Sequence, residues 1–277
     1  MTIKSPADLS RLCIHTITTK PLDFENAVYK YASLNVSGIT VWREAYSDIG
    51  PVKAGKLIKD SGLNAVSLCR GGFFPSVDKE KRRLAIADNL AALDEAYDLG
   101  VPMVVLVCGA DPAQSLDSSR EQIRYGIEAI LPKAEEFGIK LAIEPLHPVY
   151  ADTRSAINTM AQANDLVDYF DSPWVGVAVD VYHVWWDQNL KKEIDRCGEG
   201  NKIFAFHICD WKVPVIDVLN DRGIMGEGII NIPQIRQWVE DSGFDGFNEV
   251  EIFSELYWKT DQDIFLNKIL DAYYNHV

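Results

Sequence analysis

The 277-residue chain has no apolar run long enough to cross a membrane and no recognisable export signal. A membrane span needs about 18 uninterrupted apolar residues. A signal peptide needs a basic start followed by an apolar stretch, and the opening segment MTIKSPADLSRL has neither. We therefore expect a cytoplasmic protein that makes no use of membranes.

Cysteine and histidine are scarce, with five residues of each. The cysteines are scattered, odd in number and never form a C-x-x-C pair, which argues against a disulfide framework and against a thiolate zinc site. Positive charge is also in deficit, because 27 basic side chains face 41 acidic ones and leave a net charge of −14. Such a surface repels phosphodiester backbones, so we expect no nucleic-acid partner.

What the sequence does have is a regular alternation of apolar runs and amphipathic stretches from end to end. The apolar runs are four to seven residues long and nearly continuous. This pattern is typical of parallel strands that are covered on both faces. The predicted strands are Cys13–Ile17, Ile39–Trp42, Ala65–Cys69, Met103–Val107, Leu141–Glu144, Val175–Asp180, Ile203–Cys209 and Phe247–Glu251.

Helical patterns fill the gaps between these strands and close the chain. Eight strand–helix units predict a single-domain (β/α)8 TIM barrel over residues 1–277. A doubly wound open sheet would want a glycine-rich turn after the first strand, and the segment IHTITTKP offers none. The predicted helices are Asp23–Leu34, Pro51–Ser61, Lys79–Leu99, Ser118–Phe137, Ser155–Phe170, Leu190–Arg196, Ile232–Asp241 and Asp261–Tyr273.

Polar side chains end the last four predicted strands. The fifth strand ends in Glu144 and the sixth in Asp180, while the seventh carries His207. The last strand carries Glu249 and Glu251, of which Glu251 lies nearer the C-terminal end. An apolar strand has no structural use for such groups unless they are paired or bind a metal. Because the working residues of these barrels lie at the C-terminal ends of the strands, we predict one converging site.

Side-chain alternation along the strands supports this prediction. The residues two positions before the first three polar groups are small, namely Ala142, Ala178 and Ala205. Since successive strand residues face opposite ways, these positions share the face of the polar groups and suit a barrel lumen with room above it. The opposite face carries bulk for packing against the helices: Leu141, Ile143, Val177, Val179, Phe204 and Phe206.

The predicted ligand set consists of carboxylates and one imidazole, without sulfur. Oxygen and nitrogen donors of this kind favour one Mn²⁺, Mg²⁺ or Co²⁺ ion, with Zn²⁺ also open. Such an ion polarises a carbonyl and holds both oxygens of a hydroxyketone. Two carboxylates on opposite sides of a bound carbon then pass a proton through an enediolate. Glu249 shares the parity of Glu251, so it is either a partner behind the ligands or a salt bridge lower in the barrel.

Five segments resemble the sugar phosphate isomerase/epimerase family, the xylose-isomerase-like TIM barrels, and the likeness covers nearly the whole chain. They are LAIEPLHP, GVAVDVYHVWWD, HICDW, DRGIMGEGIINIPQI and EVEIFS. The family includes ketose 3-epimerases, hydroxypyruvate isomerase, inosose dehydratase and isomerase, and endonuclease IV. The motifs are specific for the superfamily rather than for one member. The run CRGGFF and the pair Trp185-Trp186 are not features of a ketose epimerase and indicate a different substrate.

The resemblance implies roles for six residues. Glu144, Asp180, His207 and Glu251 would be the metal ligands. Glu144 and Glu251 would double as the acid–base pair. His183 and Arg222 would each hydrogen-bond a substrate hydroxyl.

The rim of the predicted barrel offers further candidates for substrate binding. Arg43 ends the second strand and Arg70 the third, and either would bind substrate oxygens or form a rim ion pair. His147 follows Glu144 and either lines the pocket or belongs to a loop. Trp185 would stack on a sugar ring, pack at the mouth or support a homo-oligomer.

The sequence therefore predicts a metal-dependent isomerase or epimerase of a small keto-sugar or polyol. A keto-polyol dehydratase on the same metal site and a non-catalytic metal- or sugar-binding protein are alternatives. An endonuclease IV-like phosphodiesterase is a further alternative, but it would need three zinc ions and more ligands. Two of the five histidines, His15 and His276, lie far from the predicted cluster in sequence.

Overall fold

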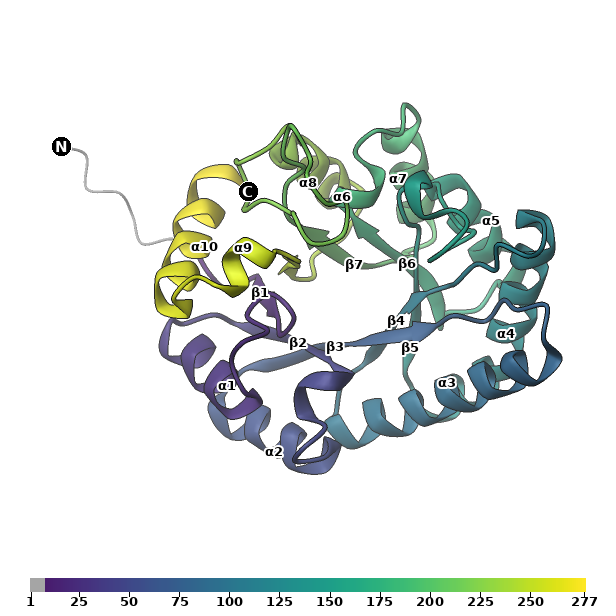
Figure 1. The fold of residues 1–277 in the computed structure, drawn as a ribbon, viewed down its shortest axis with the longest axis horizontal. Coiled ribbons are helices and arrows are strands. Elements are labelled where there is room, and N and C mark those ends of the chain that lie inside the picture. Colours follow the sequence, from purple (N-terminus) through teal and green to yellow (C-terminus); the bar gives the residue numbers. More distant parts are fainter. Residues whose placement is uncertain (1–7) are drawn as a thin grey trace.

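The structure is a computed structural model and describes residues 8–277. Eight parallel strands pair in sequence order and close into a barrel, because the first strand also pairs with the last. Figure 1 shows the helices surrounding this ring of strands. The strands are β1 (Leu12–His15), β2 (Gly38–Trp42), β3 (Asn64–Gly72), β4 (Met103–Val107), β5 (Lys140–Glu144), β6 (Val175–Asp180), β7 (Ile203–Ile208) and β8 (Asn248–Val250).

The helices follow the strands in the order expected of a (β/α)8 barrel, so the predicted fold is confirmed. No helix within residues 8–277 has the length and apolar character required for a membrane crossing. The helices are α1 (Phe24–Ser33), α2 (Pro51–Ser61), α3 (Lys79–Leu99), α4 (Leu116–Phe137), α5 (Met160–Phe170), α6 (Val181–Val184), α7 (Leu190–Glu199), α8 (Ile232–Asp241), α9 (Glu255–Trp258) and α10 (Gln262–His276), with short 3-10 turns at Arg43–Tyr46 and Pro148–Tyr150.

Helix α5 shows the largest boundary error of the prediction. It was expected from Ser155 but begins at Met160. The hydroxyl of Thr159 accepts a hydrogen bond from the backbone N–H of Gln162, which makes Thr159 the N-cap. Ser155 instead forms an isolated parallel bridge with Gly109. The segment before α5 is therefore a structured loop that carries side chains to the barrel mouth.

The barrel has separate apolar layers inside and outside the sheet. The lumen cluster includes Ala142, Ala178 and Ala205, as side-chain alternation predicts. The bulky residues of the opposite parity pack in the larger cluster between strands and helices. Phe204 is the exception, because it packs against the lumen cluster instead, next to a register shift between β6 and β7. Small side chains in the lumen leave space above them for polar groups.

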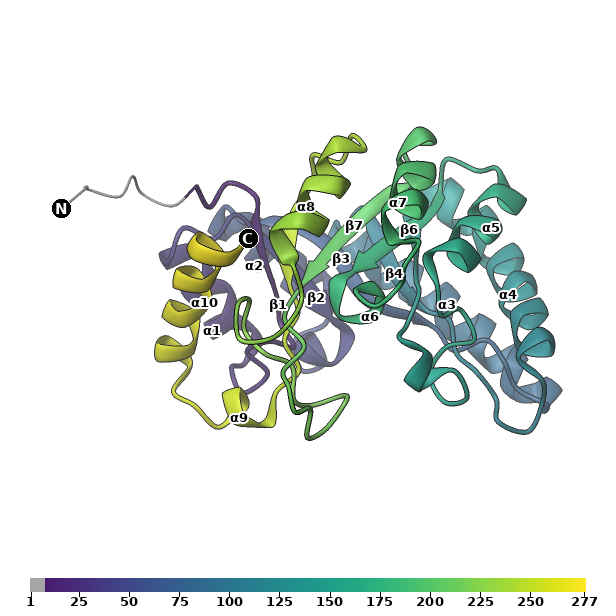
Figure 2. The ribbon, with the colours of Figure 1, turned by 90° about the horizontal axis from the view of Figure 1, so that it is seen from above.

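The loops that follow the strands gather at one end of the barrel. Figure 2 shows α9 and the long loop between β7 and α8 at this end. Because β1 pairs with β8, with Cys13 opposite Glu249, the two ends of the chain contribute side chains to the same lumen. This closure determines which residues meet at the mouth.

Candidate active site

Four predicted ligands meet at the C-terminal ends of β5 to β8. Glu144 is the last residue of β5, Asp180 is the last of β6, and His207 lies in β7 directly opposite Asp180. Glu251 follows the last residue of β8, and its backbone N–H still donates to the carbonyl of Ile208 on β7. One ligand atom from each of the four side chains lies within 4.8 Å of the other three.

This geometry suits a single divalent cation. Bonds of about 2.0–2.2 Å place opposite ligand atoms about 4.0–4.4 Å apart, close to the spacing found here. All four side chains are buried. Within residues 8–277, Nε2 of His207 is one of the few buried side-chain nitrogens without a hydrogen-bond partner. Three carboxylates and an imidazole with an unused nitrogen form a donor set that fits such an ion.

A second polar layer lies below these ligands and contains a residue that sequence reasoning missed. His15, at the end of β1, has Nδ1 3.2 Å from Oε1 of Glu251 and Nε2 3.2 Å from Oε2 of Glu249. Glu249 also accepts hydrogen bonds from the hydroxyls of Thr40 at 2.5 Å and Ser67 at 3.3 Å. Glu249 therefore forms a salt bridge lower in the barrel, which is one of the two roles that side-chain alternation allows for it.

The charges of this lower layer are fixed by mutual contact. Burial opposes protonation of His15, but its hydrogen bonds with Glu249 and Glu251 outweigh burial and raise the pKa of His15 to about 9. Burial raises the pKa of Glu249, but the contact with His15 lowers it. The net effect is a lowered pKa. Contacts through both ring nitrogens therefore link His15 to the two glutamates and help to position the Glu251 carboxylate.

The ring of His207 contacts carboxylates through both nitrogens. Its Nδ1 lies 2.9 Å from Oε1 of Glu144, and its Nε2 lies 3.8 Å from Oε2 of Glu249. Burial opposes protonation, but the hydrogen bond with Glu144 and the charge of Glu249 raise the pKa of His207 to about 9. A cation bound to this ring would take the place of that proton.

Arg222 spans the upper side of the cluster. One guanidinium nitrogen lies 3.1 Å from Oδ2 of Asp180 and 2.7 Å from Oε2 of Glu251. The other terminal nitrogen lies 3.2 Å from Nε2 of His183. The guanidinium also lies over the ring of Tyr182, 4.4 Å from its centroid. The two polar residues predicted to bind substrate, His183 and Arg222, are thus both in contact with the ligand carboxylates or with each other.

Burial and Arg222 act in opposite directions on the two carboxylates that it contacts. Burial dominates at Asp180 and raises its pKa to about 7, although Arg222 opposes this. At Glu251 burial also raises the pKa, but Arg222 and His15 together outweigh it and hold the pKa well below its usual range. Glu251 is therefore the more firmly ionised of the pair.

His183 is a neutral hydrogen-bond donor. Burial, and then the positive charge of Arg222, lower its pKa well below the ordinary histidine value. Because Nε2 accepts from Arg222, the proton of the neutral ring lies on Nδ1. That Nδ1 is buried and has no partner among residues 8–277.

The loop that carries Arg222 is organised by Asp210, another residue that sequence reasoning missed. Its buried carboxylate accepts backbone hydrogen bonds from Trp211, Gly226, Gly228 and Ile230, at 2.8–3.0 Å. Backbone hydrogen bonds between Asp210 and Gly223, and from the N–H of Arg222 to the carbonyl of Phe253, tie this loop to the barrel. The motif DRGIMGEGII thus serves to hold the guanidinium over the cluster.

Three of the four predicted rim residues separate into two places. Arg70, on β3, lines a cavity of about 470 Å³ at the mouth. His147 and Trp185 instead belong to an aromatic cluster around Trp211, with ring centroids 5.0 Å and 5.7 Å from that indole. Trp185 also lines a different cavity, which it shares with Trp238 of α8. The structure therefore brings Arg70, but not Trp185, to the cavity at the mouth.

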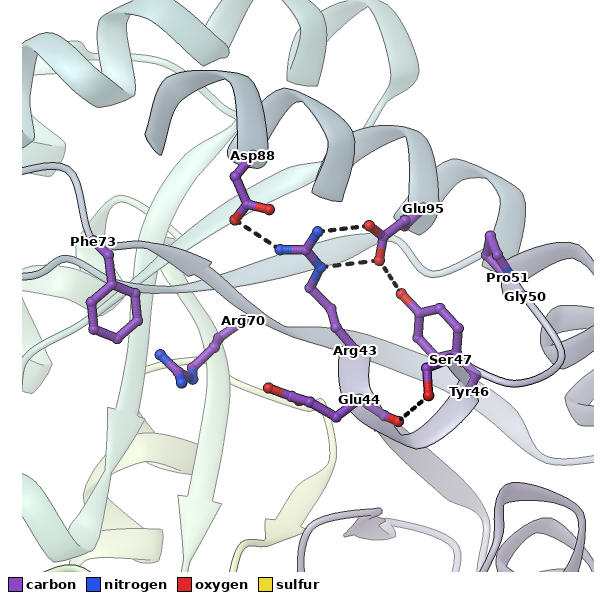
Figure 3. Close-up of a pocket in the computed structure, with 10 residues that line it drawn as sticks. All are labelled: Arg43, Glu44, Tyr46, Ser47, Gly50, Pro51, Arg70, Phe73, Asp88 and Glu95. Atoms are coloured by element: carbon purple, nitrogen blue, oxygen red, sulfur yellow. Dashed lines mark hydrogen bonds and ion pairs between the residues drawn. The ribbon is translucent and has the colours of Figure 1, made fainter. Parts of the chain in front are cut away.

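A second cavity of about 670 Å³ adjoins the first, since Arg70 and Glu44 line both. Figure 3 shows Arg43 turned away from Arg70 and toward α3. Its guanidinium nitrogens lie 2.7–3.0 Å from Glu95 and 2.9 Å from Asp88. Of the two roles predicted for Arg43, substrate binding or a rim ion pair, the structure shows the ion pair. Arg70 has no such partner among the described residues.

Comparison with known proteins gives one family match. A family model described as a xylose isomerase-like TIM barrel matches residues 28–269. The chain is 28% identical over 209 residues to an inosose isomerase of Bacillus licheniformis, covering 73% of this chain and 70% of that protein. It is 25% identical over 206 residues to the L-ribulose-5-phosphate 3-epimerase UlaE of Salmonella paratyphi A, covering 72% and 68%.

Solved structures agree with this match. Protein SMc04130 of Sinorhizobium meliloti 1021 superposes with a TM-score of 0.94 at 43% identity, covering 97% of this chain and 98% of that one. The IOLI protein with a bound zinc atom superposes with a TM-score of 0.79 at 20% identity, covering 95% and 96%. The second likeness concerns the fold alone.

Proposed function

The chain belongs to the xylose isomerase-like TIM barrel family, and we propose that it is a divalent-metal-dependent isomerase or epimerase of a small keto-sugar or keto-polyol. The observation that carries the proposal is the convergence of Glu144, Asp180, His207 and Glu251 within 4.8 Å. Relatives named as an inosose isomerase and an L-ribulose-5-phosphate 3-epimerase support this reaction class.

Charge balance supports a divalent ion at this cluster. The buried carboxylates are Glu144, Asp180, Glu249 and Glu251, and the buried cations facing them are Arg222, His15 and His207. Once His207 gives up its proton to act as a ligand, two positive charges face four negative ones. A divalent cation would restore neutrality, which buried charges require. When bound, the ion would polarise a substrate carbonyl and orient the neighbouring hydroxyl.

Glu144 and Glu251 are the proposed acid–base pair. They come from β5 and from the end of β8, with β6 and β7 between them, so they approach the cluster from different sides. A substrate carbon held between them would lose its proton to one glutamate and regain it from the other. Contacts with Arg222 and His15 keep Glu251 ionised.

His183 and Arg222 are the proposed positioning groups for substrate oxygens. The unpartnered Nδ1–H of His183 provides a donor at the edge of the cluster. Arg222 fixes the tautomer that makes this donor available, and it also neutralises carboxylate charge next to the substrate. Donors placed in this way would stabilise negative charge that develops on oxygen during proton transfer.

The direct test is to incubate the purified protein with Mn²⁺ and a panel of keto-sugars and keto-polyols in D2O. We expect deuterium at the carbon next to the carbonyl in a product that is otherwise of equal mass. A product lighter by one water molecule would show a dehydratase that uses the same base. Absence of both exchange and conversion across the panel would reject the proposed reaction.

Metal content provides a second test. We expect about one divalent ion per chain by elemental analysis, because the two candidate clusters within residues 8–277 share His207 and Glu251 and form one site. An endonuclease IV-like enzyme would bind three zinc ions instead. The net charge of −14 also disfavours such an enzyme, since it opposes binding to DNA.

A further inference from the structure

Arg70 and Arg154 differ from the other arginines of the described chain. Within residues 8–277, every other guanidinium donates to a carboxylate or a backbone carbonyl, whereas neither of these two has an acceptor. Nε of Arg70 is buried without any partner. Acceptors are not scarce in a protein with 41 acidic residues. Buried polar groups are nearly always satisfied, so the unpartnered Nε of Arg70 indicates a missing ligand.

The two arginines line the same cavity of about 470 Å³, with Lys20 as a third cation. One carboxylate, that of Glu44, also lines the cavity, but it forms no ion pair with any of the three within the described residues. Figure 3 shows Arg70 and Glu44 without a hydrogen bond between them. The cavity therefore keeps an excess of positive charge inside a strongly acidic protein.

Aromatic side chains connect this cavity to the proposed metal cluster. Trp42 lines the cavity, and its Nε1 lies 3.3 Å from Nδ1 of His15. Phe253 also lines it, and its ring centroid lies 4.9 Å from the guanidinium carbon of Arg222. The volume falls in the range of about 300–1,000 Å³ that is typical of small-ligand sites. A sugar that reaches the cluster would thus extend toward the two arginines.

Both arginines are held in place by their surroundings. The guanidinium of Arg70 lies 4.4 Å from the ring centroid of Phe73. The side chain of Asn89 clamps the end of β3, because it accepts from the N–H of Gly72 at 2.6 Å and donates to the carbonyl of Gly72 at 2.8 Å. The backbone carbonyl of Arg154 accepts from Gly109 at 2.9 Å. A guanidinium held against a ring, as that of Arg70 is, loses little entropy when it binds an anion.

We propose that Arg70 and Arg154 bind an anionic group of the substrate, a phosphate ester or a carboxylate, with Lys20 at the outer edge of the site. The guanidinium group is planar and donates in pairs, which matches the oxygens of either anion. Burial lowers the pKa of Arg154, and the positive charges of Arg70 and Arg222 lower it further. An anion between the arginines would relieve this repulsion. The identification of the ligand as a sugar rests on the proposed function; the anion site itself does not.

The test is calorimetric titration of the full-length protein with two probes, inorganic phosphate and D-gluconate, before and after treatment with a chelator. The chelator separates binding at the arginines from binding to a metal ion. We expect the double variant R70Q/R154Q to bind the preferred probe at least about tenfold more weakly than the wild type. The control variant R83Q loses the same charge from a surface pair with Glu80 and should bind as the wild type does.

Each outcome bears on the proposal. Tighter binding of phosphate than of gluconate indicates a phosphate ester, and the reverse order indicates a sugar acid. Equal affinity in the double variant and the wild type, or no binding of either probe to the wild type, would overturn the proposal. Should circular dichroism show that the double variant is unfolded, the single variants R70Q and R154Q provide the same comparison.

The outcome of this titration does not depend on the outcome of the test for isomerase activity. The titration after chelation requires neither a bound metal nor turnover. Phosphate binding that depends on Arg70 and Arg154, combined with no deuterium exchange on any sugar, would keep the anion site and reject the isomerase. Exchange without arginine-dependent binding would reject the anion site alone.

Discussion

Two regions of the barrel mouth differ in whether their charged side chains are paired. On the side of β5 to β8, the carboxylates, Arg222 and His207 are buried and contact one another. At the 470 Å³ cavity, Arg70 from β3 and Arg154 from the loop between β5 and α5 have no acceptors of their own among residues 8–277. Groups that satisfy one another are suited to hold an ion and move a proton. Groups left unsatisfied are suited to recognise what enters.

The same contrast appears within a single strand. Glu249 and Glu251 are two residues apart and face the same way, and both are buried. Glu249 lies among the side chains of His15, Thr40 and Ser67, so we expect it to contribute mainly to stability. Glu251 lies one step higher and contacts Arg222 next to the other predicted ligands. Position along the barrel axis therefore distinguishes Glu249, which we expect to be structural, from Glu251, which we propose to be catalytic.

The largest effect is expected for Glu251→Gln. The substitution removes the charge and basicity of one member of the acid–base pair while it preserves shape. We expect deuterium exchange in the keto-sugar assay to fall by roughly 10³-fold with little change in fold. The measurement is the exchange rate per milligram of protein, together with the circular dichroism spectrum.

Glu255→Gln is the matched control for this change. Glu255 lies in α9 close to Glu251 in sequence, but it is exposed and pairs with Lys259 at the surface. It should exchange at the wild-type rate. Undiminished exchange in the Glu251→Gln variant would show that the acid–base assignment is wrong.

Glu249→Gln should act on stability rather than on chemistry. Removal of Glu249 as a charged partner leaves His15 with Glu251 as its remaining carboxylate neighbour, and breaking a buried pair of this kind costs about 3–5 kcal/mol. We expect this loss in the free energy of unfolding, measured by urea denaturation. The control Glu80→Gln breaks an exposed pair with Arg83 and should cost less than about 0.5 kcal/mol. Equal urea midpoints for the two variants would remove the distinction between the two glutamates.

Much of the fold and the ligand set is accessible from the sequence because both depend on local pattern. Continuous apolar runs specify covered parallel strands, and Glu144 and Asp180 end their strands as the sequence predicts. The alternation of small and large side chains correctly places Ala142 and Ala178 in the lumen. These features need only the period of a strand and the position of its end.

The missed residues depend on contacts between distant segments. His15 seemed remote from the ligands in sequence, yet barrel closure places β1 beside β8 and brings His15 to Glu251. In the structure His15 ends β1 as Glu144 ends β5, but the predicted strand Cys13–Ile17 places His15 in mid-strand and so gives it no such signal. No comparable local signal marks Arg154 or Asp210, because both lie in loops whose paths are set by tertiary hydrogen bonds.

The smallest effect is expected for Arg43→Gln. This variant tests whether the proposed anion site depends on arginines without an ion-pair partner or on any arginine at the rim of the barrel. Arg43 lines the cavity of Figure 3 together with Arg70, but Glu95 and Asp88 already occupy its donors. In the phosphate titration we expect less than about a twofold change in affinity for this variant, because a guanidinium that is already neutralised adds little attraction for a further anion. If Arg43→Gln weakens binding as strongly as Arg70→Gln does, the anion occupies the neighbouring cavity along α3 instead. Arg43 would then count among the residues that bind the anion, although it already has ion-pair partners.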